Sequence, residues 1–182
     1  MYSGIEKDVI DEIKAWSEHA LEVPNKYFNN LPACPYARSA WKDDKVDFVF
    51  KYCAHKQDIY TAVSCFDDTK DLVIIVDFAF QESPDDFDED LKQLNNAISQ
   101  GIFIDKDIWL MGFHPFEEAN DFIDDGSFEY QVEEPYALIF VQRLSKIQES
   151  ADKIKEKGYY DSYLDEFNAS EIYQPRRDLY RR

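Results

Sequence analysis

The chain contains a nearly continuous apolar run, "LVIIVDF", at residues 72–78, in which Asp77 is the one polar residue. A run of this kind, rich in β-branched residues, is typical of a central strand that is covered on both faces. Three more strands are predicted at "KVDFVFKY" (45–52), "DIWLMGF" (107–113) and "PYALIFVQ" (135–142). The first of these alternates in the way a half-buried strand does. The chain therefore contains the strands for a sheet of about four members.

Amphipathic helices are predicted around these strands. Ser3 and Glu6 fit a capping box that begins a helix over about residues 4–22. Apolar residues also recur at helical spacing in "QDIYTAVSCF" (57–66). Two further helix faces are indicated, one after the cap Ser83 and Pro84 with Phe87, Leu91, Leu94 and Ile98, the other with Leu144, Ile147, Ala151 and Ile154.

The resulting order is α followed by βαβαββα, which predicts an α/β fold. We expect a two-layer sandwich, with an about four-stranded sheet of ferredoxin-like flavour and an added N-terminal helix. A chain of 182 residues with 45% hydrophobic residues is long enough to bury a core as a single domain over 1–182. Residues 172–182 are a candidate flexible basic tail, whose four arginines could form a small docking patch.

The charge balance is strongly acidic. The chain has 38 acidic and 20 basic residues, for a formal net charge of −18. Such a charge repels nucleic-acid phosphates and anionic membranes, so neither is expected as a direct partner. A solvated acidic surface, attraction to a basic partner and mimicry of nucleic acid all stay open. The sequence shows no signal peptide and no membrane span, and it predicts a cytoplasmic protein with three reduced cysteines.

The stretch "NNLPACPYARSAW" (29–41) contains the first candidate site residue. If Pro35 is the first residue of a helix, Cys34 is its N-cap, where unpaired amides and the helix dipole favour a thiolate. The pattern thus predicts a reactive cysteine with a depressed pKa, and Arg38 would add a positive charge nearby. The alternative is that Cys34 fills a small apolar gap.

The second candidate is His114 in "WLMGFHPFEEAND" (109–121), where a strand ends. Sites of α/β proteins lie beyond the carboxyl ends of strands, and the following Pro115 holds the histidine in an extended conformation. His114 could be a general base or a metal ligand. The alternative is a histidine that is hydrogen-bonded within its loop.

These residues predict one pocket. Asp77 should lie at the same carboxyl edge as His114. If the helix after Cys34 packs over that edge, Cys34, Arg38, Asp77, His114 and Tyr136 converge. Cys34 and His114 are the candidate catalytic residues, and Arg38, Asp77 and Tyr136 the candidate substrate-binding residues. No cofactor is indicated, and linear spacing gives no support for a metal site. The acidic stretches "SPDDFDED" and "NDFIDDG" do not fit a calcium loop.

Three segments carry a resemblance to a known family: "LPACPYARSAW", "LMGFHPFEEAND" and "EPYALIFVQRLSKIQESADKI". Their order and spacing resemble the Cys-Pro-Phe-Ala, Phe-His-Pro and Pro-Tyr-Pro elements of a bacterial domain family of unknown function. The resemblance covers about residues 10–157, and Trp16 matches a tryptophan of that family's N-terminal helix. It implies that Cys34 and His114 belong together, but it supplies no chemistry.

The chain departs from that family before Tyr136. The family tends to carry an Asn-Arg pair there, whereas this chain has "YQVEEPY" with Glu133 and Glu134. Tyr136 is retained, and Ala137 stands in place of the second proline. Acids in place of a basic side chain put a shared anionic substrate in doubt.

Two hypotheses from different classes follow. In the first, the protein is a small cytosolic enzyme that acts on an unidentified small molecule through Cys34 and His114. In the second, it is an acidic protein-interaction module, of which a nucleic-acid mimic that binds a basic partner is one form. A distance between the Cys34 and His114 side chains within hydrogen-bond reach would favour the enzyme hypothesis.

Overall fold

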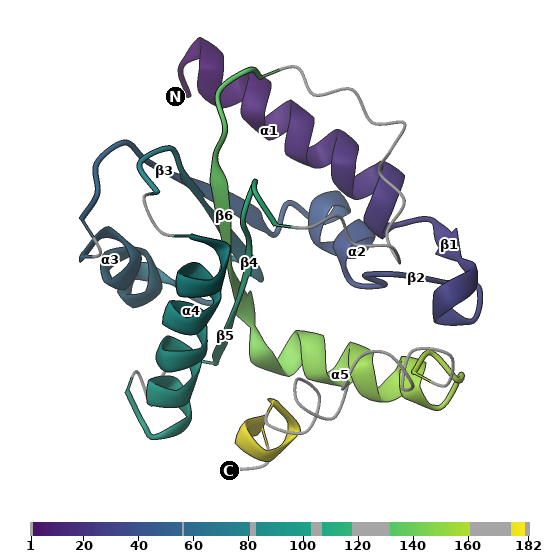
Figure 1. The fold of residues 1–182 in the computed structure, drawn as a ribbon. Coiled ribbons are helices and arrows are strands. Elements are labelled where there is room, and N and C mark those ends of the chain that lie inside the picture. The colour runs from purple at the N-terminus through teal and green to yellow at the C-terminus, as the bar shows by residue number, and fades with distance from the viewer. Residues whose placement is uncertain are drawn as a thin grey trace. The chain divides into compact units, whose positions relative to one another are not determined.

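The computed structural model describes residues 2–55, 57–80, 83–102, 107–117, 132–160 and 176–180 (Figure 1). Within these residues, no helix has the length and apolar character needed to cross a bilayer.

The chain divides into two compact units, and each is built from separate stretches. The helical unit contains Met1–Lys42, Ala119–Val132 and Leu144–Arg182, and the sheet unit contains Asp43–Glu118 and Glu133–Arg143. A single domain over 1–182 stays a prediction.

The sheet unit confirms the predicted α/β class, with a four-stranded mixed sheet packed against helices. Its strands are β3 (Val46–Lys51), β4 (Leu72–Asp77), β5 (Ile108–Phe113) and β6 (Ala137–Arg143), in the order β3-β4-β6-β5. β3 and β4 are parallel, while β6 is antiparallel to both of its neighbours. The strands β3, β4 and β5 therefore run in one direction, and their last residues share one edge of the sheet, called here the carboxyl edge.

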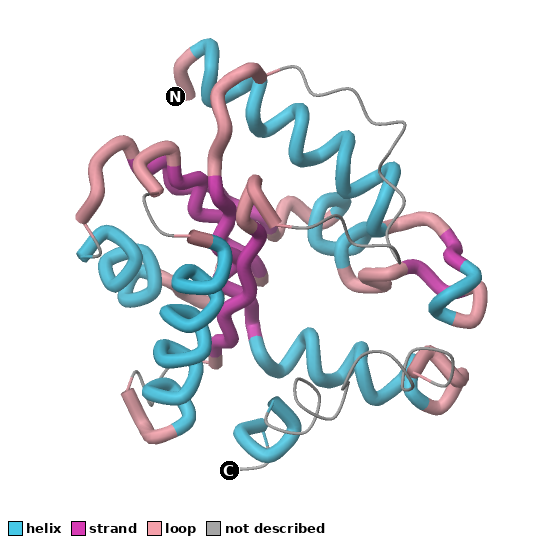
Figure 2. The backbone as a smooth tube through the Cα atoms, in the orientation of Figure 1, coloured by secondary structure: helices cyan, strands magenta, loops and turns pink. Residues whose placement is uncertain are grey.

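Two helices connect these parallel strands. α3 (Gln57–Cys65) joins β3 to β4, and α4 (Pro84–Ser99) joins β4 to β5, passing the position of β6. Both helices lie on the same face of the sheet (Figure 2). A ferredoxin-like sheet is made from two split βαβ halves, so the observed topology differs from that expectation. The difference arises because both crossover helices precede the antiparallel pair β5–β6.

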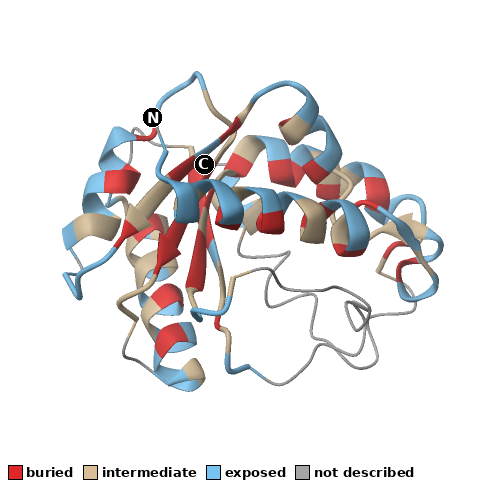
Figure 3. Ribbon diagram, turned by 90° about the horizontal axis from the view of Figure 1, so that it is seen from above, coloured by how far each residue is buried: buried red, intermediate tan, exposed pale blue. Residues whose placement is uncertain are grey.

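The core of the sheet unit confirms the predicted central strand. Residues 73–77 of β4 are all buried, and Figure 3 shows buried residues along the strands of the sheet. Ser83 caps α4 as predicted, and its side chain accepts a hydrogen bond from the Asp86 amide. Gly112 lets α4 approach β5, because a Cβ there would lie 2.3 Å from Leu91 Cδ1. The Leu91 and Phe87 side chains of α4 thus pack directly on the backbone of β5 at Gly112.

The outer strand β5 has a polar cover on its free edge. Asn95 of α4 donates from Nδ2 to the Leu110 carbonyl at 2.8 Å, and its Oδ1 accepts from the Leu110 amide at 2.9 Å. The side chain therefore replaces one residue of a missing neighbouring strand. Such covering limits pairing with other chains.

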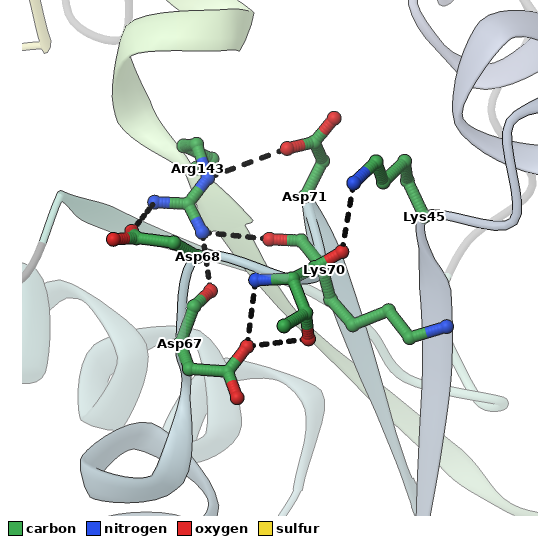
Figure 4. A network of polar contacts seen from close by, with 7 residues as sticks. Lys45, Asp67, Asp68, Lys70, Asp71 and Arg143 are labelled. Carbon is green, nitrogen blue, oxygen red and sulfur yellow. Dashed lines mark hydrogen bonds and ion pairs between the residues drawn. The ribbon is translucent and has the colours of Figure 1, made fainter.

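An arginine network lies at the edge opposite to the carboxyl edge (Figure 4). Arg143, the last residue of β6, donates to the carboxylates of Asp68 and Asp71 at 3.3 Å and to the carbonyl of Lys70 at 2.7 Å. Its guanidinium also donates to the Asp67 carbonyl and lies over the Phe66 ring. This arginine holds the turn before β4 in place, which is a structural role.

The helical unit begins with α1 (Gly4–Trp16), continued by the π-helical turn η1 (Ser17–Leu21). The predicted capping box of Ser3 and Glu6 is present. Its other elements are β1 (Pro24–Asn25), η2 (Lys26–Phe28), β2 (Leu31–Pro32), α2 (Ala37–Lys42), α5 (Leu144–Lys155) and a helical turn at 176–180. The rest of the candidate tail at 172–182 lies outside the described residues.

Two contacts tie distant segments into the helical unit. The amide of Val132 donates to Glu12 Oε2 at 2.8 Å, and Glu12 is a buried residue of α1. The ring of Tyr159 stacks on Phe28 at 4.9 Å. The first of these contacts pairs a buried carboxylate with a backbone donor, as burial requires.

Candidate ligand site at the carboxyl edge of the sheet

The carboxyl edge collects polar residues from three strand ends. Lys51 ends β3, Asp77 ends β4 and His114 follows β5, while Tyr136 directly precedes β6. The register places Asp77 opposite Ala137 and Phe113 opposite Leu138. The structure therefore brings three of the five predicted site residues, Asp77, His114 and Tyr136, to one edge.

Lys51 and Asp77 form a buried ion pair at this edge. The Lys51 Nζ lies 2.5 Å from Asp77 Oδ2, and both side chains are 5% exposed. The other carboxylate oxygen of Asp77 accepts a hydrogen bond from the Ala79 amide at 2.8 Å. Asp77 is thus engaged by a cation and by the backbone, which compensates for its burial.

Sequence reasoning missed Lys51. It stands among alternating apolar residues of a predicted strand, where a lysine suggests a solvent-facing position. The signal that could have found it is the parallel register, in which Lys51 is the direct neighbour of Asp77. That register is a property of the folded sheet.

His114 is buried and enclosed by aromatic rings. Its Nδ1 accepts a hydrogen bond from the Phe116 amide at 3.2 Å, so the proton of the neutral ring resides on Nε2. The ring centroids of Phe80 and Phe87 lie 5.0 and 5.5 Å away. One ring nitrogen of His114 is thus hydrogen-bonded within its own loop, as the alternative interpretation of this residue expected. A catalytic role of His114 stays a prediction.

The turn after His114 contains a second titratable group. Glu117 Oε2 accepts a hydrogen bond from the His114 amide at 3.3 Å. Burial raises the pKa of the Glu117 carboxyl above its ordinary value, and this hydrogen bond partly opposes the rise. The carboxyl therefore takes up a proton at a higher pH than an exposed glutamate.

Aromatic side chains surround these polar groups. The ring of Tyr52 stacks on Phe78 at 5.3 Å, and Phe78 meets Tyr136 edge-on at 5.7 Å. Phe116 meets Phe80 edge-on at 5.8 Å. These five residues form the edge aromatic group. Its outer members are largely open to solvent, since Tyr52 is 56% and Phe116 65% exposed.

Cys34 does not occupy the predicted helix N-cap. α2 begins at Ala37, and Pro35 and Tyr36 form a turn closed by a hydrogen bond from the Ala37 amide to the Cys34 carbonyl at 3.2 Å. Burial raises the pKa of the Cys34 thiol, although hydrogen bonds from the backbone of Ala37 and Tyr36 act in the opposite direction. The predicted depressed pKa is therefore wrong, because desolvation outweighs the backbone donors.

Arg38 does not supply the expected charge to Cys34. Its Nε lies 3.3 Å from Glu22 Oε2, and its Nη2 donates to the Glu22 carbonyl at 3.1 Å. Glu22 also accepts from Ser17 Oγ at 3.0 Å. The guanidinium is therefore paired with a carboxylate that itself raises the pKa of the Cys34 thiol.

The remaining cysteines form no cluster in the described part of the chain. Cys53 and Cys65 are exposed, and within the described ranges no three His, Cys, Asp or Glu side chains are placed to hold a metal ion. The acidic stretch 83–90 forms the start of α4, whereas 120–126 lies outside the described residues.

Cys34 and Arg38 belong to the helical unit, and the other three predicted residues belong to the sheet unit. A pocket shared by Cys34 and His114 therefore stays a prediction.

Comparison of the chain with models of protein families, with curated proteins and with solved structures gives no match. The resemblance to the bacterial domain family, drawn from three short segments, stays a prediction as well.

Proposed function

We propose that the protein binds a small molecule with a planar ring at the carboxyl edge of its sheet. The observation that carries this proposal is the edge aromatic group, in which two largely exposed rings stand beside buried polar groups. Ligand sites of α/β proteins lie beyond the carboxyl ends of parallel strands. They combine aromatic surface with a few fixed polar groups.

The aromatic residues support a flat ligand. The rings of Tyr52 and Phe78 are nearly parallel, at 6°, so another ring can continue the stack on the outer face of Tyr52. Offset stacking of this kind adds to the free energy of apolar burial. Phe116 offers a second exposed ring at the same edge.

The charges near the edge favour a neutral or cationic ligand. Glu133 and Glu134 are exposed and stand three and two positions before Tyr136, with Pro135 between them and the tyrosine. The positive charge of Lys51 is neutralised by Asp77. A cationic ring system would gain from both the carboxylates and the aromatic faces, whereas an anionic one would be repelled.

The test compares three probes that share one ring: tryptamine, indole and indole-3-acetate. Amide and aromatic NMR shifts are followed during titration of the full chain. We expect shift changes at Tyr52, Phe116 and their neighbours, with tryptamine binding most tightly and indole-3-acetate least. The variants Tyr52→Ser and Phe116→Ser should each weaken tryptamine binding.

The matched control is Ile102→Ser, which removes an exposed apolar side chain beyond the far end of α4. It should leave binding unchanged. Absence of shift changes at the carboxyl edge, or equal binding by all three variants, would refute the proposal. Catalysis is a separate question, tested by Cys34→Ser once a ligand is known.

A second candidate function is an acidic interaction module that binds a basic protein in the cytoplasm. The observation that favours it is the net charge of −18, together with exposed acids on α4 at Asp85, Asp86, Asp88 and Glu89. Its test is the salt dependence described in the Discussion.

A further inference from the structure

Arg176 is a partly buried cation in the helical unit, within the helical turn at 176–180. Its Nε is buried and has no hydrogen-bond partner. Among the residues that the structure describes, no carboxylate forms an ion pair with it. Buried charges in proteins are normally paired, so an unpaired guanidinium requires an explanation.

The groups around Arg176 are hydrogen-bonding but uncharged at neutral pH. Tyr160 forms a side-chain hydrogen bond with it, and Tyr159 and Cys34 lie close enough to interact electrostatically. Burial lowers the pKa of the Arg176 guanidinium, and these three groups act to raise it. The neighbourhood thus holds a buried guanidinium and several polar hydrogens.

Nearby carboxylates are engaged elsewhere. Glu22, whose charge raises the pKa of the Cys34 thiol, accepts a hydrogen bond from Ser17 and pairs with Arg38. Asp152, whose charge raises the pKa of the Tyr160 hydroxyl, accepts a hydrogen bond from Gln148 Nε2 at 2.9 Å. Neither carboxylate is among the groups that act on the Arg176 guanidinium.

The tyrosines beside Arg176 are held by ring packing and by a hydrogen bond. Tyr159 donates from its hydroxyl to the Ala33 carbonyl at 2.6 Å, and its ring stacks on Phe28. Tyr160 meets Tyr159 edge-on at 4.8 Å. Because Ala33 adjoins Cys34, these contacts fix the tyrosine pair next to the thiol. Holding the Tyr160 hydroxyl in place in this way reduces the entropic cost of binding.

We propose that Arg176, Tyr160 and Cys34 form a binding site for a small oxyanion, the carboxylate or phosphate group of a ligand. The planar guanidinium binds such groups through two parallel hydrogen bonds, and its unused Nε is available for one of them. The Tyr160 hydroxyl and the Cys34 thiol supply further donors. This site is independent of the proposed ring-binding edge, and it selects the opposite ligand charge.

The acidity of the protein makes this inference sharply testable. A chain with net charge −18 repels anions from most of its surface, so bound oxyanion reports a specific site. Inorganic phosphate and acetate serve as probes, with sodium chloride at matched ionic strength as the blank. We expect either probe to slow alkylation of Cys34 by iodoacetamide, while exposed Cys53 keeps its rate as an internal reference.

The decisive variant is Arg176→Gln, which should lower oxyanion affinity by about tenfold or more. Lys153→Gln removes the same charge from an exposed position of α5 and should bind like the wild type. Arg176→Lys keeps the charge but loses the planar fork, and it serves if the glutamine variant fails to fold. We expect intermediate affinity from it.

Protection of Cys34 by phosphate or acetate that is lost on changing Arg176 would support the site, and the more effective probe would identify the ligand group. Equal protection in wild type and both Arg176 variants would overturn the proposal. So would the absence of any protection at millimolar concentrations of both probes.

Discussion

At the scale of single residues, burial decides the chemistry of Cys34. The turn before α2 directs backbone donors at the thiol, as the Cys-Pro pattern suggested, but desolvation raises the pKa of the thiol. A raised pKa leaves a smaller thiolate fraction at every pH below it. Cys34 is therefore a weaker nucleophile than its sequence context predicts.

This leads to a first expectation for thiol reactivity. At pH 7, iodoacetamide should modify Cys34 more slowly than Cys53 and Cys65, which are both exposed. The Cys34 rate should rise as the pH increases toward and beyond the ordinary range of cysteine, because the thiolate is the reacting form. Mass-spectrometric mapping at several pH values measures this order. Fastest labelling at Cys34 would contradict it.

The second residue-scale expectation concerns Lys51 and Asp77. Asp77→Asn leaves a buried lysine without its counter-charge and should lower the free energy of unfolding by about 3–5 kcal/mol. Asp44→Asn is the control, because Asp44 is almost fully exposed in its 3.5 Å pair with Lys70. Loss of that surface pair should cost below about 1 kcal/mol.

Denaturant unfolding of both variants measures the difference. The double variant Lys51→Met with Asp77→Leu should recover much of the lost stability, since an apolar pair removes the buried charge. Equal stability of Asp77→Asn and Asp44→Asn would show that the pair contributes little.

Among the helices and strands, a sequence pattern predicted the start of a helix correctly when the contacts behind it lie within one turn. Ser3 with Glu6 and Ser83 with Pro84 fixed helix starts, because a cap satisfies amides within its own turn. Pro35 failed as such a signal. Its segment forms a turn first, and α2 starts two residues later, at Ala37.

The cover on strand β5 gives an element-scale expectation. Asn95→Leu removes both hydrogen bonds to Leu110 and should lower the free energy of unfolding by about 1–3 kcal/mol. It also frees the edge of β5 for pairing with another chain, so we expect concentration-dependent self-association. Unfolding curves and light scattering measure the two effects.

The neighbouring Asn96 provides the control, since it is exposed and its side chain accepts a hydrogen bond from Gln100, the C-cap residue of α4. Asn96→Ala should stay monodisperse and nearly as stable as the wild type. Self-association of both variants alike would argue against a covering role of Asn95.

At the scale of the whole molecule, the sequence predicted the sheet better than the contacts that complete it. The apolar run at 72–78 and the strand ends placed Asp77, His114 and Tyr136 along one edge. Lys51 and Arg143 escaped notice, because their partners are set by strand register and by a turn 72 positions away in sequence. Arg176 was treated as part of a tail, since no local pattern indicates what a terminal arginine contacts.

The net charge gives an expectation for the whole chain. If the protein is an acidic interaction module, a basic partner should bind with an affinity that falls steeply between low and physiological salt. Pull-downs at two salt concentrations, followed by titration of any basic protein that is recovered, measure this. Recovery of no basic protein at low salt would remove the second candidate function and leave ring binding unaffected.

The interleaved order of the two units has a consequence for biosynthesis. In chain order, residues 1–42 belong to the helical unit and residues 43–118 to the sheet unit. The chain then re-enters the helical unit, where the Val132 amide bonds Glu12, before β6 completes the sheet. During synthesis, all residues of the sheet unit have therefore been made once Arg143 is added. The helical unit is incomplete until Tyr159 is made, because the ring of Tyr159 stacks on Phe28, 131 positions earlier. The sheet unit has its full set of strands first, and α1 emerges long before Val132, whose amide bonds the buried Glu12 of that helix. No single cut in the gene separates the two units.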